Sequence, residues 1–234
     1  MGILHRDVSP NNIMYRIVKS KVYGVLADYD LASWASSLTS DYTKTSQQRT
    51  GTPPFMAFGL LDGSNGLHLY RHDVESFFYV MAIMATQYEI QARRKGDAGG
   101  VRMRRGELPF ELWFNEPSYV KLASFKKTFH LDLEYLDLSP TFEDFRGWLV
   151  KLRRSFNRGL LCARQHRSDE DAMESCDEGT PAPFDEETLG GYVNYSALTD
   201  PARNLKGKLK GLVVRYRSQS PPLPTSTGAV KAGL

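Results

Sequence analysis

Cysteine is scarce in this sequence. The 234 residues include two, Cys162 and Cys176, and neither belongs to a C-x-x-C or C-x-x-x-H pattern of the kind that binds zinc. Two isolated cysteines beside an acidic stretch favour free thiols over a disulfide. We therefore expect a reducing intracellular location, either cytoplasmic or nuclear.

Long hydrophobic runs and a strong charge of one sign are also absent. No apolar stretch approaches the roughly 20 residues of a membrane-spanning helix. His5, Arg6 and Asp7 interrupt the place where a signal peptide would have its hydrophobic core. The net charge of +3 is a small excess of 30 basic over 27 acidic residues. We expect neither a membrane nor a nucleic acid as a partner.

The sequence does contain enough apolar residues for a sizeable core, at 41% hydrophobic and 12% aromatic. The run VYGVLA at 22–27 predicts a buried strand that ends just before Asp28. Apolar residues at helical spacing predict a core helix over 70–90, and Ser139-Pro140 predicts the N-cap and first turn of another helix. The expected fold is therefore mainly α with a short β hairpin region.

Several segments are too polar or too rich in glycine to belong to that core. We interpret 33–50 as a long polar loop and 93–105, with six basic residues, as a mobile solvated loop. The stretch 168–187 has nine acidic residues and no basic one, which predicts a disordered or solvating insertion. Residues 205–234 are interpreted as a basic and then flexible tail.

The opening stretch HRDVSPNNIM contains the groups that a phosphoryl-transfer site needs. Such a site requires a carboxylate that accepts the proton of the attacking hydroxyl, and hard oxygen ligands for Mg²⁺. Asp7 and Asn12 are five residues apart in a loop that can direct one at the substrate and the other at a metal. Asp28, at the end of the predicted strand, adds a second oxygen ligand. An ordinary turn built on Pro10, Asn11 and Asn12 is the alternative interpretation.

Four features in this order resemble the large lobe of protein kinases. His5-Arg6-Asp7 and Asn12 match the catalytic-loop pattern H-R-D-x-x-x-x-N. Asp28-Tyr29-Asp30 resembles the metal-binding D-F-G turn, GTPPFMA at 51–57 resembles the end of an activation segment, and Asp73 follows at the start of the core helix. The variants GILHRDVSPNNIM, LADYDLAS and ETLGGYVNY resemble the fungal-type protein kinase family, from about Gly2 to near Asn204.

That resemblance implies ATP and Mg²⁺ as cofactors, a protein as substrate, and a role for each matching residue. Asp7 would be the catalytic base, and Asn12 and Asp28 the Mg²⁺ ligands, so that Asp28 also serves nucleotide binding. The remaining implied roles are a partner for activation-segment charge (Arg6), an aromatic residue packed in the metal turn (Tyr29), a hydroxyl near the base (Thr52) and an acceptor for catalytic-loop amides (Asp73). Thr43, Thr45, Ser46 and Thr50 are candidate phosphosites that Arg6 could pair, or ordinary loop residues.

Three positions depart from the wider protein-kinase pattern. Ser9 stands where serine/threonine kinases usually have a lysine that contacts the transferred phosphate, so its contribution to catalysis would differ. Asp30 replaces a glycine in the metal turn. Gly59 stands where the activation segment normally ends in a glutamate, so the buried ion pair that usually anchors this segment must be absent or rebuilt.

The small lobe of a protein kinase, with its Gly-rich loop and nucleotide lysine, has no counterpart in this sequence. Only four residues precede His5, and no G-x-G-x-x-G occurs after it. We therefore expect residues 1–204 to be a kinase-like large lobe lacking the N-terminal lobe, with little activity by itself.

Three functions from different classes fit these residues. The first is a serine/threonine protein kinase that transfers the γ-phosphoryl group of ATP to a protein hydroxyl. The second is a non-catalytic pseudokinase or interaction module, favoured by the absent nucleotide lysine. The third is a small-molecule kinase related to aminoglycoside and choline kinases, against which GTPPFMA argues because those enzymes lack this platform for a protein substrate.

Overall fold

The computed structural model describes residues 2–19, 21–34, 51–63, 67–91, 100–104, 108–131, 136–176 and 183–203. Within this part the protein is mainly helical, with three small antiparallel sheets of two strands each. The predicted mainly-α class with a hairpin region is confirmed at this level. The candidate phosphosites of 43–50, the tail 205–234 and most of the basic loop 93–105 lie outside the described residues.

The N-terminal third forms two small sheets around the opening motif. Strand β1 (Ile3–Leu4) pairs with β4 (Ser33–Trp34), and a 3-10 turn, η1 (Pro10–Asn12), leads into a hairpin of β2 (Ile13–Val18) and β3 (Lys21–Leu26). Proline at the first position of η1 fits the fixed φ that such a turn needs. The loop that contains Asp7 therefore lies between a strand and a hairpin that are both fixed by backbone pairing.

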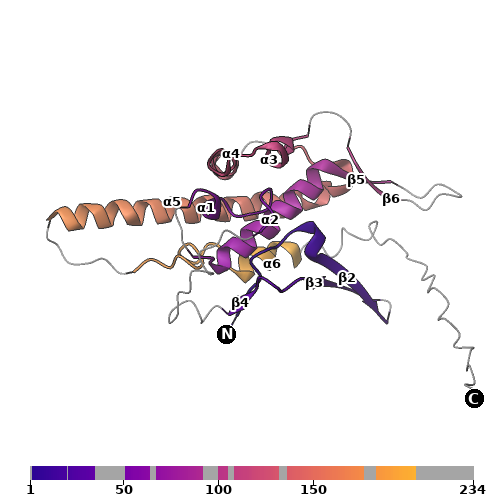
Figure 1. Ribbon diagram of the computed structural model, residues 1–234, viewed down its shortest axis with the longest axis horizontal. Helices are drawn as coiled ribbons and strands as arrows, with labels where there is room; N and C mark the ends of the chain where they lie inside the picture. Colours follow the sequence, from indigo (N-terminus) through magenta and orange to yellow (C-terminus); the bar gives the residue numbers. More distant parts are fainter. Residues whose placement is uncertain are drawn as a thin grey trace, which may run out of the picture.

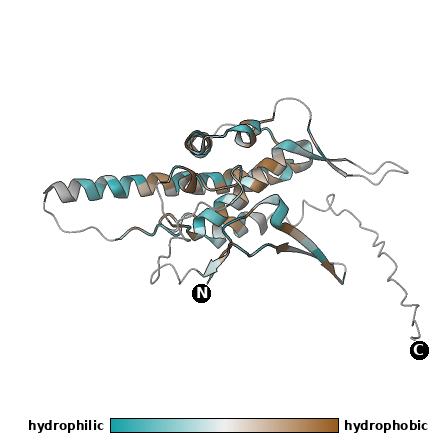
Figure 2. Ribbon diagram, in the orientation of Figure 1, coloured by the Kyte–Doolittle hydropathy of each residue, from teal (hydrophilic) through white to brown (hydrophobic). Residues whose placement is uncertain are grey.

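The β2–β3 hairpin differs from the expected buried strand because both of its strands are largely exposed. Val22 is 67% exposed, and Met14, Tyr15 and Ile17 each expose half or more of their surface. In Figure 1 the hairpin projects away from the helices, and Figure 2 shows hydrophobic residues along it. The apolar, β-branched composition of 22–27 thus indicates that the segment forms a strand, but it does not indicate that the strand is buried against a core.

The predicted core helix is α2 (Tyr70–Gln87), preceded by the short α1 (Phe58–Leu61). The helix ends three residues earlier than expected, because Tyr88–Gln91 forms strand β5 and pairs with β6 (Gly100–Met103). Thirteen side chains of α2 are buried, on all sides of the helix. This matches the all-round apolar pattern of its sequence.

The remaining helices pack around α2. They are α3 (Glu111–Asn115), α4 (Tyr119–Leu131), the 3-10 turn η4 (Pro140–Phe145), α5 (Arg146–Cys176) and α6 (Tyr195–Arg203). In Figure 1 the long α5 crosses α2, with α3 and α4 on one side and α6 on the other. The centre of the core is aromatic, built on Phe78, Tyr79, Phe129 and Phe156.

The start and end of α5 both differ from the sequence expectation. The Ser139 side chain does not cap the helix. The chain instead enters the 3-10 turn η4, and the backbone oxygen of Ser139 accepts the first hydrogen bond of this turn, from the N–H of Phe142 at 2.9 Å. Disorder was expected from 168 onward, whereas α5 continues through Cys176. The pair Gln165 and Asp169, joined at 2.7 Å on successive turns, supports this helical continuation.

None of the helices within the described ranges combines the length and the apolar character needed to cross a membrane.

Candidate functional site

Asp73, in the first turn of α2, fixes the backbone of the opening motif. Its Oδ2 accepts the N–H of His5 at 2.6 Å, and its Oδ1 accepts the N–H of Arg6 at 3.0 Å. The Nε2 of His68 lies 2.8 Å from the same Oδ1, and the Asp73 side chain is only 15% exposed. One carboxylate therefore ties the loop to the core helix, 67 residues further along the chain.

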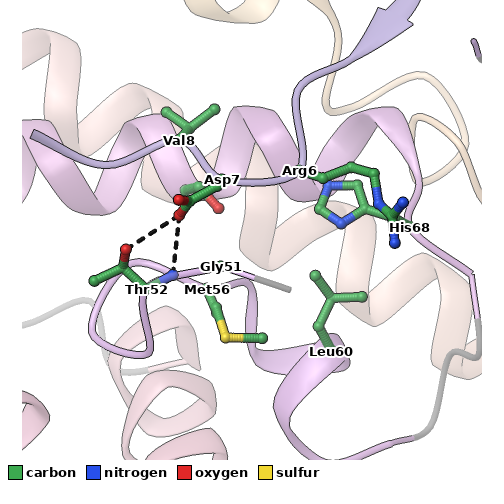
Figure 3. A pocket seen from close by; sticks show the side chains of 9 residues that line it. Arg6, Asp7, Val8, Gly51, Thr52, Met56, Leu60 and His68 are labelled. Carbon is green, nitrogen blue, oxygen red and sulfur yellow. Dashed lines mark hydrogen bonds between the residues drawn. The ribbon is translucent and has the colours of Figure 1, made fainter. Parts of the chain in front are cut away.

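The Asp7 carboxylate is held from two sides. Its Oδ1 accepts both the backbone N–H of Thr52 at 3.0 Å and the hydroxyl of Thr52 at 3.1 Å (Figure 3). Its Oδ2 accepts an N–H of the Asn12 side chain at 3.2 Å, and the same amide nitrogen donates to the Asp7 carbonyl at 2.9 Å. The carboxylate is thereby oriented before any substrate arrives, which is the arrangement that a positioned proton acceptor needs.

Asn12 and Asp28 are brought together by the hairpin between them. The N–H of Ala27 donates to the Asn12 carbonyl at 2.8 Å, so the residue before Asp28 is bonded to Asn12. The ring of His5 reinforces this junction, because its Nε2 lies 2.8 Å from the Ala27 carbonyl oxygen. Asn12 and Asp28, 16 positions apart, therefore flank the end of the β2–β3 ladder at which Ile13 pairs with Leu26.

Two of the candidate residues have left-handed backbone conformations. The φ angle is 71° at Arg6 and 62° at Asp28, in a region that residues other than glycine rarely occupy. Strain of this kind persists where surrounding contacts fix the backbone, and it occurs often at functional sites. At Arg6 the contact that fixes it is the Asp73 hydrogen bond. At Asp28 it is the attachment of Ala27 to both Asn12 and His5.

The oxygen atoms of Asn12 and Asp28 are suitable ligands for Mg²⁺. Both are hard donors, and Asp28 is exposed, with no partner among the described residues. The side-chain nitrogen of Asn12 donates to Asp7, so the Oδ1 atom of Asn12 points away from the Asp7 carboxylate. In the described part of the chain no group of three His, Cys, Asp or Glu side chains could hold a metal by itself.

Three other residues predicted to belong to the site make fewer contacts with Asp7, Asn12 and Asp28. Ser9 is buried, at 2% exposed, and its backbone oxygen begins the turn that ends at Asn12. The Nη1 of Arg6 lies 3.5 Å from the Leu31 carbonyl oxygen. Tyr29 was expected to pack as a core aromatic, but it is 51% exposed, and its ring makes a T-shaped contact with the His5 ring, at 4.8 Å between centroids. This differs from the expectation because the described part of the chain packs little else over this turn.

Sequence reasoning missed two buried charges that hold the segment 51–58. Lys126 of α4 donates from Nζ to the carbonyls of Pro53, Pro54 and Met56, at 3.0, 2.9 and 2.5 Å. Glu75 of α2 accepts the N–H of Phe58 at 2.9 Å. Gly59 provides no side chain for this purpose. The signal available in the sequence was a lysine among apolar residues of a helix at 126, whereas Glu75 follows the polar residues Arg71 and His72 and gave no clear signal.

Glu75 and Lys126 respond to burial in opposite directions. Burial alone raises the pKa of Glu75, but hydrogen bonds from His130, Tyr79 and the N–H of Phe58 outweigh it and lower the pKa to about 2. Burial lowers the pKa of the Lys126 ammonium well below its usual value, against the attraction of Glu75. The Lys126 ammonium also lies 4.4 Å from the centre of the Tyr79 ring, a cation–π contact.

The acidic stretch also contributes to the site, through its last residues. Glu187 caps α2, because its Oε2 accepts the N–H of Tyr70 at 2.7 Å and its carbonyl accepts the N–H of Arg71 at 3.2 Å. A carboxylate at a helix N-terminus is favourable for both hydrogen bonding and charge. Glu186 pairs with the buried Arg71 at 2.8 Å. These contacts stabilise the turn of α2 that contains Asp73.

A small hollow lies beside Asp7, on the side facing segment 51–58. Its lining is part polar, from Asp7 and Thr52, and part apolar, from Val8, Met56 and Leu60 (Figure 3). The hollow therefore adjoins the oriented carboxylate.

Comparison with known proteins gives one match. Residues 1–85 match the family model described as fungal protein kinase. The matched range contains β1, the β2–β3 hairpin, segment 51–58 and most of α2, so the candidate residues Asp7, Asn12, Asp28, Thr52 and Asp73 all lie within it. No curated protein and no solved structure matches the chain.

Proposed function

Because residues 1–85 match the model of the fungal protein kinase family, we propose that this chain carries the large lobe of a protein kinase. The reaction would transfer the γ-phosphoryl group of ATP to a serine or threonine hydroxyl of a protein. One observation supports this proposal most directly: the Asp7 carboxylate is oriented by two hydrogen bonds from Thr52 and one from Asn12.

In the proposed reaction Asp7 orients the substrate hydroxyl and accepts its proton as the oxygen attacks the phosphorus. Thr52 keeps the carboxylate turned toward the hydroxyl, and Asn12 holds its other oxygen. Asn12 Oδ1 and Asp28 would bind Mg²⁺, which when bound neutralises phosphate charge. Asp73 keeps the backbone of His5 and Arg6 in place throughout.

The exposed hairpin supports a place for the nucleotide base. Asn12 immediately precedes β2, and one residue, Ala27, separates Asp28 from the end of β3, so the apolar hairpin adjoins the residues proposed to bind the metal and the phosphates. Ile17 and Val22 pair across the ladder and therefore share one face, where they offer exposed apolar surface on which an aromatic base can stack.

Binding and transfer assays on the purified chain test the proposal. Titration with ATP, in Mg²⁺ and in EDTA, measures nucleotide binding, and labelled ATP with a mixed protein substrate measures transfer. We expect Asp7→Asn to abolish transfer while Mg²⁺-dependent ATP binding persists, because Asp7 contacts the hydroxyl and not the metal. Measurable transfer that is equal for the variant and the wild-type chain would contradict the proposal.

A non-catalytic interaction module is the second candidate, favoured by the same hairpin. Its six large apolar side chains exposed by more than 40% are Met14, Tyr15, Ile17, Val18, Val22 and Tyr23. A surface of this kind fits a protein partner as well as a nucleotide base. ATP binding in Mg²⁺ separates the two candidates. Absence of binding would favour the module over the kinase if it is found for this chain and also for a longer product of the same reading frame that has a Gly-rich loop and a strand lysine.

A further inference from the structure

Segment 51–58 is fixed at both ends and along its middle. At its start Thr52 donates twice to Asp7, and at its end the N–H of Phe58 donates to Glu75. Between these points the backbone carbonyls of Pro53, Pro54 and Met56 point at one atom, Lys126 Nζ. The two prolines have no N–H, so this part of the segment has few backbone donors of its own with which to form regular structure.

Lys126 is an unusual residue to find in this position. It is 0% exposed, on a helix whose other buried residues include Leu122 and Ala123. A buried ammonium is costly unless each of its donors has a partner. Here its three N–H groups meet three carbonyl oxygens, and the rings of Tyr79 and Trp113 lie 4.4 and 5.0 Å from the nitrogen. The three hydrogen bonds of the Lys126 ammonium can therefore form together only when segment 51–58 has this conformation.

We infer that Lys126 is a positioning residue that holds segment 51–58 in the conformation in which Thr52 meets Asp7. The inference depends on the proposed kinase function for its kinetic consequence, but not for its structural one. Pro53 links the two contacts, since its carbonyl binds Lys126 and its neighbour Thr52 binds Asp7. A glycine at position 59 has no side chain with which to anchor the segment, and Lys126 and Glu75 anchor it from α4 and α2 instead.

The inference also concerns the substrate side of the site. The hydrogen bonds of Lys126 Nζ go to segment 51–58 and not to Asn12 or Asp28, the candidate ligands of the metal, whereas Thr52 of this segment contacts Asp7, the proposed base that meets the substrate hydroxyl. Loss of the Lys126 contacts should therefore disturb the protein substrate more than the nucleotide.

Amide hydrogen exchange on the full chain tests the structural part. We expect Lys126→Met to increase exchange about tenfold in peptides covering 51–58, where the amides of Thr52 and Phe58 are protected by Asp7 and Glu75, with α2 and α5 little changed. Lys127→Met is the matched control, since Lys127 is the next residue of α4 and is exposed. It should exchange like the wild-type chain.

Lys126→Gln provides a second variant, because a side-chain amide donates to some of the three carbonyls without a buried charge. We expect its exchange at 51–58 to fall between those of the wild-type chain and Lys126→Met. Unchanged exchange at 51–58 in Lys126→Met would overturn the inference. So would an equal increase across α2 and α5, or failure of both variants to fold, because either result would make Lys126 a general structural residue.

Steady-state kinetics test the remaining part and separate the two proposals. If the chain transfers phosphate, Lys126→Met should raise KM for the protein substrate several-fold and leave KM for ATP within about twofold. An equal rise in both would contradict the positioning role. Failure of the kinase proposal has a different signature: no Asp7-dependent transfer in the wild-type chain, with the exchange results unaffected.

Discussion

Thr52 and Asp7 are 45 residues apart in the sequence, yet the amide and the hydroxyl of Thr52 both donate to the same oxygen of Asp7, at 3.0 and 3.1 Å. Two donors on one oxygen fix the rotation of the carboxylate as well as its position. The other oxygen is then directed toward Asn12, 3.2 Å away. The orientation of the proposed base thus depends on a segment from a distant part of the sequence.

Removal of the Thr52 hydroxyl should slow phosphate transfer. Thr52→Val keeps the shape and the backbone hydrogen bond but removes one donor to a charged acceptor, an interaction worth about 1.5–3 kcal/mol. We expect kcat/KM to fall by about tenfold or more. Thr52→Ser retains the hydroxyl and should stay close to the wild-type chain. A Val variant as active as the Ser variant would contradict the role given to this contact.

Substitution of Asp28 should weaken nucleotide binding only when Mg²⁺ is present. Asp28→Asn removes the charge that the metal prefers, and asparagine tolerates the left-handed φ of 62° at this position. We expect calorimetry to show ATP binding in Mg²⁺ weakened about tenfold, and binding in EDTA unchanged. Asp30→Asn, two residues further and also exposed, is the matched control. Equal effects of the two substitutions would argue against a metal ligand at Asp28.

Asp73→Asn should reduce the stability of the fold. An amide can accept with one oxygen only, and its NH₂ group would face the N–H of His5 or Arg6, so one buried donor loses its partner. We expect the free energy of unfolding in urea to fall by about 1–3 kcal/mol. Asp144→Asn, at an exposed position of η4, is the control and should leave the urea midpoint unchanged. A similar midpoint for both variants would show that Asp73 does not stabilise the loop.

Glu75 predicts a loss of stability in acid. In the folded protein the pKa of Glu75 is about 2, whereas its usual value is 4.5. Between pH 2 and 4.5 the Glu75 carboxylate therefore binds a proton in the unfolded chain but not in the folded one. The stabilisation by this carboxylate is therefore fully present above pH 4.5 and is lost as the pH falls to 2. The loss amounts to about 3 kcal/mol, since each unit of difference in pKa corresponds to roughly 1.4 kcal/mol. Denaturant midpoints across this range should fall less steeply for Glu75→Gln. Parallel pH profiles for the variant and the wild-type chain would contradict this assignment.

Two glycines of α5 should respond in opposite ways to alanine. A Cβ at Gly159 would lie 2.7 Å from the Cβ of Leu189, whose backbone is itself left-handed, at φ 53°. Gly159→Ala should therefore lower the thermal midpoint, by overpacking worth about 1–3 kcal/mol. Gly147 has no atom within 4 Å of the added carbon, so Gly147→Ala should be neutral or stabilise by up to about 1 kcal/mol. A loss of stability in Gly147→Ala similar to that in Gly159→Ala would show that the Leu189 contact is not the cause.

Local sequence predicted much of the helical part. The all-round apolar pattern of 70–87 produced the core helix α2, and the mainly helical class followed from it. Its end was wrong by three residues, because the pairing of Tyr88–Gln91 with Gly100–Met103 depends on a partner outside the local window. The acidic composition of 168–187 predicted disorder. Instead, α5 continues through Cys176, and the contacts that Glu186 and Glu187 make with the first turn of α2 are tertiary, across more than 100 residues of sequence.

The sequence by itself determined the identity and order of the candidate groups, because Asp7, Asn12, Asp28, Thr52 and Asp73 stand at recognisable spacings. Their catalytic and metal-binding roles stay predictions. The tertiary structure decided which atoms meet: Asp73 with the amides of His5 and Arg6, Thr52 with Asp7, and Lys126 with three carbonyls. The physical reason is range. Spacing reflects the needs of a local loop, whereas a buried charge such as Lys126 is stabilised only by partners that folding brings from about 70 residues away.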